Sequence, residues 1–525
     1  MIRKRNRGRG IVLPSVLFIV VVLSLATYYF SERLIDDLEY IAAQQGAVAR
    51  RTAGDSGVAY VAALTDSKHW DRVDRRDNRQ RFHEILVSNQ HSDVHFSIVR
   101  PVRSREAELR FGIVDESGKL NLNDLGLEPK EEEFSRQRLL LIPGMTLQAA
   151  DSILDWLDED NEPREYGAER NYYQTQKPPQ LPTNGPVDSL AELAHVRGVN
   201  EHLLFGEDTN GDGWLDSNED DGDLSWPPDD ADGYLRQGFS SYLTVHSGEA
   251  THRWDGEPKI NLNSDKLGEL FDAVSNAFDE ETAIFVVGLR LTGPTNWKEE
   301  TINPTKALEV RLREQLGPEN SDQLQEQAEV TKENVSRAGI DLSVAPRFRI
   351  RSLYDLFGTQ VRVARGDIDG LVSSPWSAKR QDILQWLPKL HRQMAVAGSE
   401  GIQGRVNVNT APIEVLRGIR GLTEEHVVAI EAKRKQRQRR PQPEDDTTTS
   451  WLLEEGILEL DGLRRTGQYL TGRGDVFSIT VLAYRLNVGP LTRISAILDA
   501  TEYPSRIVRR FDRPTLPATF REQLQ

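Results

Sequence analysis

The sequence predicts a mixed α+β protein: one membrane-spanning helix at the N-terminus, a small α/β domain, and helical modules inserted between its strands. Three observations predict this fold. An uncharged apolar run of twenty residues covers positions 11–30. Segments with β-branched or aromatic alternation lie near both ends of the chain, at 96–99, 109–114, 476–484 and 491–498. A short apolar-Asn-apolar-Asn motif occurs three times between them, each time ahead of a helix-like stretch.

The composition narrows the class of protein. The 525 residues are 38% hydrophobic and 28% charged, which excludes a polytopic membrane protein and a fully disordered chain. The absence of cysteine excludes disulfide scaffolds, thiol catalysis and cysteine zinc sites. With a formal net charge of -17, the chain is a poor general binder of nucleic acid and favours cations as ligands.

The N-terminus has the features of a membrane anchor. Five of the first ten side chains are basic, and residues 11–30 follow without a charge. Twenty helical residues span roughly 30 Å, enough to cross the bilayer core. The basic flank should stay in the cytoplasm and the bulk of the chain should lie across the membrane. A secretory signal peptide fits less well, because the apolar run is long and no small-residue cleavage site follows it.

The helix is expected to run on to about Leu64, since apolar residues recur at helical spacing and no proline follows Pro14 in this stretch. This layout, with a short basic leader that ends in glycine, resembles the N-terminal region of type IV pilins and pseudopilins. The resemblance implies cleavage by prepilin peptidase between Gly10 and Ile11 and methylation of the new amine. Loss of the five leader charges would leave a mature net charge near -22.

One position departs from the pilin pattern. Most pilin-like proteins carry glutamate at the fifth mature position, where its carboxylate would pair with the N-terminal amine of a neighbouring subunit; here that residue is Ser15. The change suggests a subunit with no neighbour below to pair with in that way. Minor pseudopilin K of type II secretion systems also lacks this glutamate and sits at the tip of the pseudopilus.

The repeated motif occurs at Leu120–Asn123, Ile260–Asn263 and Val406–Asn409. Each copy leads two short helices, and its asparagines are natural N-caps. In the first and third copies a glycine, Gly144 or Gly421, should allow the tight turn between the helices. The units resemble helix-hairpin-helix or SAM-like modules.

The third copy leaves an alternative function open, because hairpins of this kind bind nucleic acid through backbone N–H groups and basic side chains. The alternative is a membrane-anchored helix-hairpin-helix protein of DNA uptake. Against it, the first two copies are acidic, and an acidic stretch at 441–446 follows the basic run, so a solvated or packing module remains the other interpretation. The basic residues concerned are Arg417, Arg420, Lys433, Arg434, Lys435, Arg437, Arg439 and Arg440.

Further motifs resemble the type II secretion protein K family in the family's order. They cover roughly residues 1–205 and 400–500. The resemblance implies a minor pseudopilin, not an enzyme, in the inner membrane with its bulk in the periplasm. It would cap the pseudopilus tip and assist export of folded proteins across the outer membrane, with I- and J-type minor pseudopilins, the major pseudopilin and the inner-membrane platform as partners. The motifs are 112–123, Asp155–Asp160 with Glu165–Glu169 and Tyr172–Tyr173, 184–198, and 469–477.

These features divide the chain into eight segments. They are a leader at 1–10, a transmembrane helix at 11–30, a pilin-like helix with the first strands at 31–118, a first SAM-like module with a calcium loop at 119–235, a partially duplicated middle with a polar linker at 236–400, a second SAM-like/helix-hairpin-helix module at 401–465, closing pilin-like strands at 466–500, and a loose tail at 501–525.

Residues 208–219 match a twelve-residue calcium loop of EF-hand type. Oxygen-bearing residues stand at positions 1, 3, 5, 9 and 12, a backbone carbonyl is available at position 7, and Gly213 takes the sharp turn at position 6. Calcium prefers six to eight hard oxygens in flexible geometry, which this spacing supplies. An acidic surface loop is the alternative. The expected ligands are Asp208, Asn210, Asp212, Trp214 (through its carbonyl), Asp216 and Glu219.

A second group of carboxylates is a weaker candidate for an ion site, because its spacing fits no standard loop. Its residues are Asp158, Asp160, Glu165 and Glu169, and a solvated, capped helix end is the alternative. Catalytic signatures such as HExxH, G-x-S-x-G and a Walker loop are absent from the sequence, so we expect no enzymatic activity.

Overall fold

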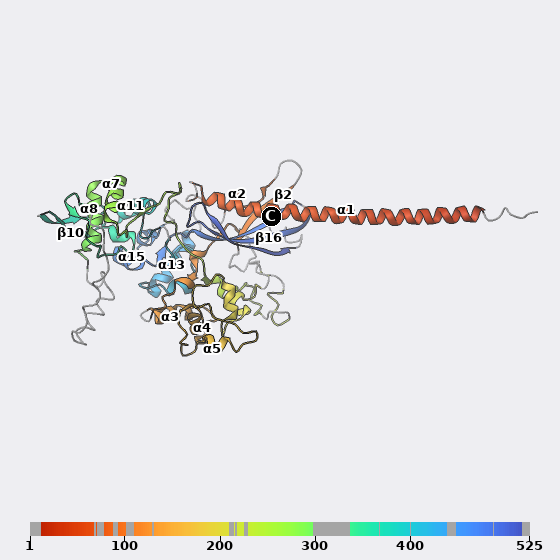
Figure 1. The fold of residues 1–525 in the computed structure, drawn as a ribbon, viewed down its shortest axis with the longest axis horizontal. Coiled ribbons are helices and arrows are strands. Elements are labelled where there is room, and N and C mark those ends of the chain that lie inside the picture. The colour runs from red at the N-terminus through yellow and green to blue at the C-terminus, as the bar shows by residue number, and fades with distance from the viewer. Residues whose placement is uncertain are drawn as a thin grey trace, which may run out of the picture.

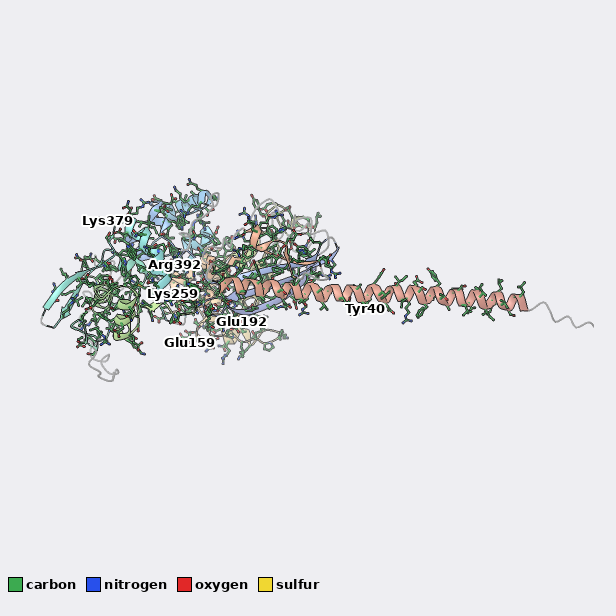
Figure 2. All side chains as sticks on the ribbon, turned by 90° about the horizontal axis from the view of Figure 1, so that it is seen from above. Tyr40, Glu159, Glu192, Lys259, Lys379 and Arg392 are labelled. Carbon is green, nitrogen blue, oxygen red and sulfur yellow. The ribbon has the colours of Figure 1, made fainter. Side chains whose placement is uncertain are left out.

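The computed structural model describes residues 12–67, 70, 78–87, 93–100, 110–128, 131–208, 215, 218–224, 229–297, 336–366, 368–398, 401–437, 448–486 and 488–516. Helix α1 (Val12–Thr65) runs unbroken for 54 residues and projects far beyond the rest of the molecule (Figure 1). Its apolar N-terminal part is long enough to cross a membrane and buries nothing against the protein, and Tyr40 still points into open space (Figure 2). The single apolar helix expected at the N-terminus is therefore confirmed, and it fits a single-pass membrane anchor.

The C-terminal part of α1 packs on an antiparallel sheet built from both ends of the chain. The strand order is β1-β2-β15-β16-β17, with β3 beside β2 and β4 beside β15. Strand β2 therefore pairs directly with β15, and the intervening residues form the inserted helical part. The strands are β1 (Ile85–Leu86), β2 (Val94–Arg100), β3 (Arg110–Phe111), β4 (Val114–Asp115), β15 (Val476–Arg485), β16 (Val488–Asp499) and β17 (Arg506–Leu516).

Two glycines let α1 lie close to this sheet. A side chain at Gly54 would come within 2.5 Å of Ile494, and one at Gly57 within 2.5 Å of Val481. Any larger residue at either position would displace core residues of β15 and β16. The α1–sheet core is a separate apolar cluster from that of the helical modules.

The expectation of a loose tail after residue 501 is wrong for residues 506–516. They form β17, which pairs antiparallel with β16 from Asp499↔Arg506 to Leu491↔Leu516. The three prolines and five arginines of residues 502–525 predict loose packing from composition alone. The strand forms nevertheless because it lies at the edge of the sheet, where charged side chains remain in solvent and where proline is tolerated.

The three repeated motifs each begin a closed unit. A two-residue strand at the motif pairs in parallel with a two-residue strand at the far end of the same unit. We expected a partial duplication in the middle of the chain, but the middle unit has the same closure as the other two. The pairs are β5 (Leu120–Asn121) with β6 (Leu243–Thr244), β7 (Ile260–Asn261) with β12 (Met394–Ala395), and β13 (Val406–Asn407) with β14 (Leu470–Thr471).

This pairing also moves the unit boundaries. The first unit extends to Thr244, beyond the expected end at 235, and the third extends to Thr471, beyond the expected end at 465. A parallel partner 123 residues away in the first unit, or 64 residues away in the third, leaves no local signal in the sequence.

The asparagines of the motif have two different roles. The first asparagine of each copy accepts the backbone N–H two residues on, which fixes the turn as expected of a cap. The second asparagine joins the start of the unit to its end. Asn263 donates to the carbonyls of Ile350 and Val396 and accepts from the Ile350 amide, and Asn123 makes the same three bonds with Val187 and Val245.

The helices between these strands lie mostly in pairs, and one continuous apolar core joins the three units. Gly144 and Gly421 adopt positive φ in their helix-hairpin turns, as expected. Besides α1, the α-helices described are α2 (Arg79–Phe82), which precedes the first unit, and, within the units, α3 (Glu132–Leu140), α4 (Leu147–Leu157), α5 (Arg170–Tyr173), α6 (Glu201–Phe205), α7 (Leu267–Ala277), α8 (Glu280–Thr292), α11 (Arg380–Gln393), α12 (Ile413–Arg417), α13 (Glu424–Arg437), α14 (Trp451–Glu454) and α15 (Leu460–Thr466).

The middle unit also carries two small hairpins, β8 (Ser336–Arg337) with β9 (Ile340–Asp341) and β10 (Gln360–Arg365) with β11 (Ile368–Ser373). Strand β10 lies at the end of the molecule farthest from the free end of α1 (Figure 1).

A half-buried carboxylate, Asp115, and a buried one, Glu116, connect the sheet to the helical units. Asp115 accepts hydrogen bonds from the Asn407 side chain and the Gly474 amide, both at 2.7 Å. Glu116 accepts from Thr244 and Ser478 at 2.6 Å and forms an ion pair with Lys119. Burial alone would raise the pKa of Glu116, but Lys119 and the two hydroxyls outweigh it and lower this pKa. The Asp-Glu pair thus fixes the first and third units to β15.

Candidate functional site

The two ends of the predicted calcium loop lie in the described part of the chain. Asp208 and Glu219, at loop positions 1 and 12, are both buried, with 5% and 1% of their surface exposed. The side chain of Gln237 donates to Asp208 Oδ2 at 2.9 Å. The other expected ligands, Asn210, Asp212, Trp214 and Asp216, lie outside the described residues.

The segment that follows the loop is held by its own carboxylates. Asp229 accepts the backbone amides of Asp221, Gly222 and Ala231, and Asp220 accepts the amide of Gly233. Those amides lower the pKa of Asp229 and outweigh the opposing effect of desolvation. Carboxylate and carbonyl oxygens are the donors that calcium prefers, so the residues present fit this ion.

The first carboxylate of the loop, Asp208, interacts electrostatically with the sheet. Arg493 of β16 is 1% exposed, and burial together with Arg513 lowers the pKa of this guanidinium to about 10 while the charge of Asp208 opposes the shift. A buried arginine beside the first loop carboxylate means that the charge balance of the loop affects packing on the sheet.

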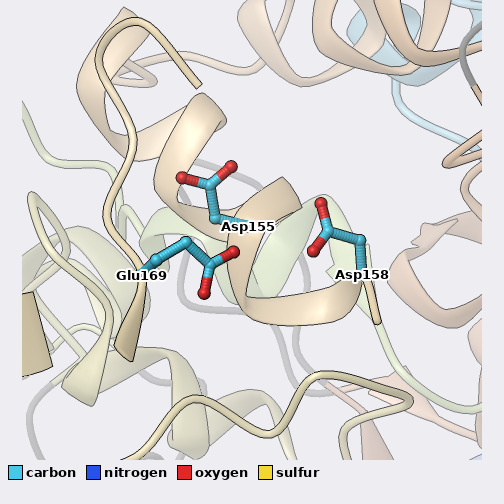
Figure 3. A group of neighbouring side chains, drawn as sticks. All are labelled: Asp155, Asp158 and Glu169. Carbon is cyan, nitrogen blue, oxygen red and sulfur yellow. The ribbon is translucent and has the colours of Figure 1, made fainter. Parts of the chain in front are cut away.

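A second acidic group comes together in the first unit. Asp155 and Asp158 lie at the C-terminal end of α4, and Glu169 faces them from the chain before α5 (Figure 3). One carboxylate oxygen of each lies within 4.8 Å of the others, and all three residues are buried. A side chain at Gly167 would meet Asp155 Oδ2 at 1.9 Å, so only glycine leaves space for this carboxylate.

The guanidinium of Arg164 partly neutralises this carboxylate cluster. Its Nη1 donates to Asp155 at 2.6 Å and to Asp158 at 2.5 Å, while its Nε donates to Glu132 at 2.8 Å. Burial raises the pKa of Asp155 and of Asp158 in spite of the arginine. Burial and the charges of these two aspartates raise the pKa of Glu169 to about 7.

Two oxygens in the carboxylate cluster lack a hydrogen-bond partner among the described residues, Asp158 Oδ1 and Glu169 Oε1. Unpartnered buried carboxylate oxygens are costly, and a cation or a shared proton would compensate them. The group therefore fits a hard cation bound beside Arg164, with Asp158 and Glu169 as its open ligands.

This arrangement differs from the expected second ion site. Asp158 and Glu169 belong to the carboxylate cluster, but Asp160 and Glu165 are exposed and are not part of it. Arg164 is missing from the expected set, and Asp155 belongs to the expected acidic stretch Asp155–Asp160 without being one of the named ligands. The three-residue spacing of Asp155 and Asp158 on one helix was a usable signal, whereas the return of Arg164 and Glu169 depends on the loop between them.

The basic run in the third unit is paired within the protein. Each cation described there contacts a carboxylate, and Arg420 reaches across to Glu131 of the first unit and lies over the ring of Phe134. Neutralised cations of this kind are poorly suited to binding phosphates. The other pairs are Arg417–Glu424, Lys433–Glu455, Arg434–Glu431, Lys435–Glu431 and Arg437–Glu455; Arg439 and Arg440 lie outside the described residues.

The expected processing site, Gly10–Ile11, also lies outside the described residues. From Leu13 onward, the helix exposes its apolar side chains along the predicted membrane segment. Ser15 lies in the first turns of this helix.

Comparisons with known proteins point to one family. A family model described as "Type II secretion system (T2SS), protein K" matches residues 118–205, which include the carboxylate cluster. A "Putative type II secretion system protein K" of Escherichia coli (strain K12) is 37% identical over 60 residues, which cover 11% of this chain and 18% of that protein. The solved GspK-GspI-GspJ complex from enterotoxigenic Escherichia coli aligns with 92% of this chain and 99% of that chain at 9% identity, but its TM-score of 0.34 is too low to establish a shared fold.

Proposed function

We propose that this chain, whose residues 118–205 match the family model for protein K of type II secretion systems, caps the tip of a pseudopilus. In this role it assists the export of folded proteins across the outer membrane. The chain is anchored in the inner membrane by α1, and its bulk lies in the periplasm. Prepilin peptidase processes it between Gly10 and Ile11. The role is structural and requires no catalytic group.

The observation that carries this proposal is the protein K domain on a chain whose α1 runs from an exposed apolar segment into a sheet. An apolar helix face this long needs lipid or other helices around it. I- and J-type minor pseudopilins and the major pseudopilin supply such helices, and the secretion platform holds the base of the assembly.

The position at the tip is supported by the two ends of the molecule. Ser15 offers no carboxylate to the N-terminal amine of a neighbouring subunit. At the other end, three helical units enlarge the molecule beyond the sheet (Figure 1). A subunit with this bulk leaves no room for a further subunit above it.

We also propose that residues 208–219 bind calcium as a structural ion. The support is a ligand residue at every required position and the burial of Asp208 and Glu219 at the two ends. When bound, calcium would neutralise these carboxylates and stabilise the folded loop. A second cation held by Asp158 and Glu169 beside Asp155 is a weaker proposal, supported by the two unpartnered carboxylate oxygens.

The test is deletion of the gene for this chain in its own organism, followed by complementation. We expect secreted proteins to accumulate folded in the periplasm and the full-length chain to restore their release. Complementation with Gly10→Val should fail because the leader is retained. Normal secretion in the deletion strain would contradict the proposal, and a selective loss of DNA uptake would favour the alternative function.

A further inference from the structure

The free edge of the sheet carries an unusual surface. Among the described residues, β17 has a neighbouring strand on one side only. Three large apolar or aromatic side chains are about half exposed at its beginning: Ile507 at 47%, Tyr503 at 47% and Trp254 at 59%. We call these three residues and the arginines of β17 the β17 edge surface. Tryptophan, tyrosine and arginine are the residues most enriched at the energetic centres of protein interfaces.

This surface is basic in an acidic protein. Residues 506–516 contain four arginines and one aspartate, a net charge of +3 in a chain of net charge -17. Arg506 keeps 61% of its side-chain surface exposed although it pairs with Asp499. Self-pairing of two such edges would oppose arginine to arginine, so the charges disfavour a second copy of this chain and favour an acidic partner.

The surface is held rigidly before any partner arrives. The backbone amide of Ser505 donates to Asp66 at 2.9 Å, and its hydroxyl lies 3.0 Å from that of Thr65. The turn that carries Trp254 packs closely against Tyr503, because a side chain at Gly256 in this turn would come within 2.5 Å of the Tyr503 ring. Preorganised aromatic groups lose little entropy on binding.

The edge also runs along α1. Asp512 pairs with Arg51 and Arg510 pairs with Asp55, so that β17 follows α1 in the antiparallel direction up to the Ser505–Asp66 contact. In an assembly built around parallel N-terminal helices, an edge that lies along the helix faces sideways, toward the neighbouring subunit.

We propose that the β17 edge surface docks an acidic extended segment of a neighbouring pseudopilin, which adds to the sheet as a strand beside β17. The choice of a pseudopilin as partner rests on the proposed function. Backbone pairing supplies the affinity of such strand addition, while the arginines and the aromatic side chains of this edge select the segment.

The test uses the full-length chain in detergent, co-expressed with the I- and J-type pseudopilins of the same organism. A photo-crosslinking amino acid replaces Ile507, and a matched control replaces Leu86, which is also 47% exposed but lies on β1 at the opposite edge. We expect crosslinks from position 507 to one partner, mapped by mass spectrometry to an acidic segment, and few from position 86.

Affinity measurements with substituted chains complete the test. Tyr503→Ala should weaken the complex at least about tenfold, and the double variant Arg506→Gln/Arg513→Gln should also reduce its salt dependence. Tyr166→Ala and Arg465→Gln remove exposed side chains of the same types from the helical units and should have little effect. Hydrogen exchange of β17 verifies that the variants keep the strand.

The outcomes separate the two proposals. A complex that forms normally with the edge variants, or that crosslinks equally from positions 86 and 507, would overturn the docking surface and leave the proposed function intact. Failure of the unmodified chain to bind either partner would overturn both.

Discussion

Replacement of Asn263 by alanine should make local opening of the middle unit easier at its seam, the place where Asn263 is bonded to Ile350 and Val396. The change removes three hydrogen bonds, two to the carbonyls of Ile350 and Val396 and one from the Ile350 amide, at 2.7, 2.8 and 2.9 Å. Each bond contributes about 1 kcal/mol net, so we expect the free energy of local opening to fall by about 2 to 3 kcal/mol. That loss corresponds to roughly 30- to 150-fold faster exchange of the amides at the seam.

Hydrogen exchange followed by mass spectrometry is the suitable assay, because unfolding of a chain with several units is not a single two-state transition. Peptides that cover residues 260–265, 348–352 and 394–397 should exchange faster in Asn263→Ala, and those of the first unit should not. Asn171→Ala removes an exposed asparagine whose side chain makes no hydrogen bond to the described residues, and it serves as control. Equal exchange in the two variants would refute the role assigned to the second asparagine of each motif.

Three other predictions concern charged groups. Burial would raise the pKa of Glu249, but Arg405 and His391 outweigh it and hold this pKa at about 2; the resulting stability exists above the ordinary pKa and is lost as pH falls toward 2. Glu249→Gln should therefore lower the free energy of local opening around this residue by about 3 kcal/mol at pH 7 and by less at pH 3, measured by hydrogen exchange followed by mass spectrometry. Burial raises the pKa of Asp355 to about 6, so its ionisation costs stability between pH 4 and 6. The stability of Asp355→Asn relative to the unmodified chain should accordingly rise by about 3 kcal/mol over that range, and a flat difference would contradict the assignment. Calcium at a hundred times its dissociation constant should stabilise the folded chain by about 2.7 kcal/mol and raise Tm in a thermal melt, an effect that Glu219→Ala should abolish and Asp369→Ala should not.

Periodicity and composition were sufficient to predict the elements that depend on local sequence. The long helix, the strands on both sides of the insertion and the glycine turns of the helix hairpins are all where the pattern placed them. The pairing between distant segments was not predictable. Leu120 pairs with Leu243 and Ile260 with Met394, and nothing near either residue specifies such a partner.

The edge strand shows a different limit. The arginines and the proline of residues 506–516 predict poor packing by composition, but at the edge of a sheet these same residues are compatible with a strand. The segment is terminal and polar, and nothing in its own sequence shows that β16 offers a free edge with which it can pair.

The carboxylate cluster was predicted in part. Asp158 and Glu169 were identified because acidic residues were dense there, and density alone also selected Asp160 and Glu165, which are exposed. In the folded chain, Arg164 donates a hydrogen bond to Asp155, and the missing side chain at Gly167 leaves space for the Asp155 carboxylate. The conformation of the loop between α4 and α5 brings these residues together, and no periodic pattern in the sequence predicts that conformation.

Electron microscopy of assembled pseudopili, with a gold label attached at an exposed residue of the middle unit such as Lys379, tests the proposed position most directly. A single label at one end of each fibre is the result expected of a tip subunit. Labels distributed along the fibre, or fibres that carry none, would contradict the assignment of this chain to the tip.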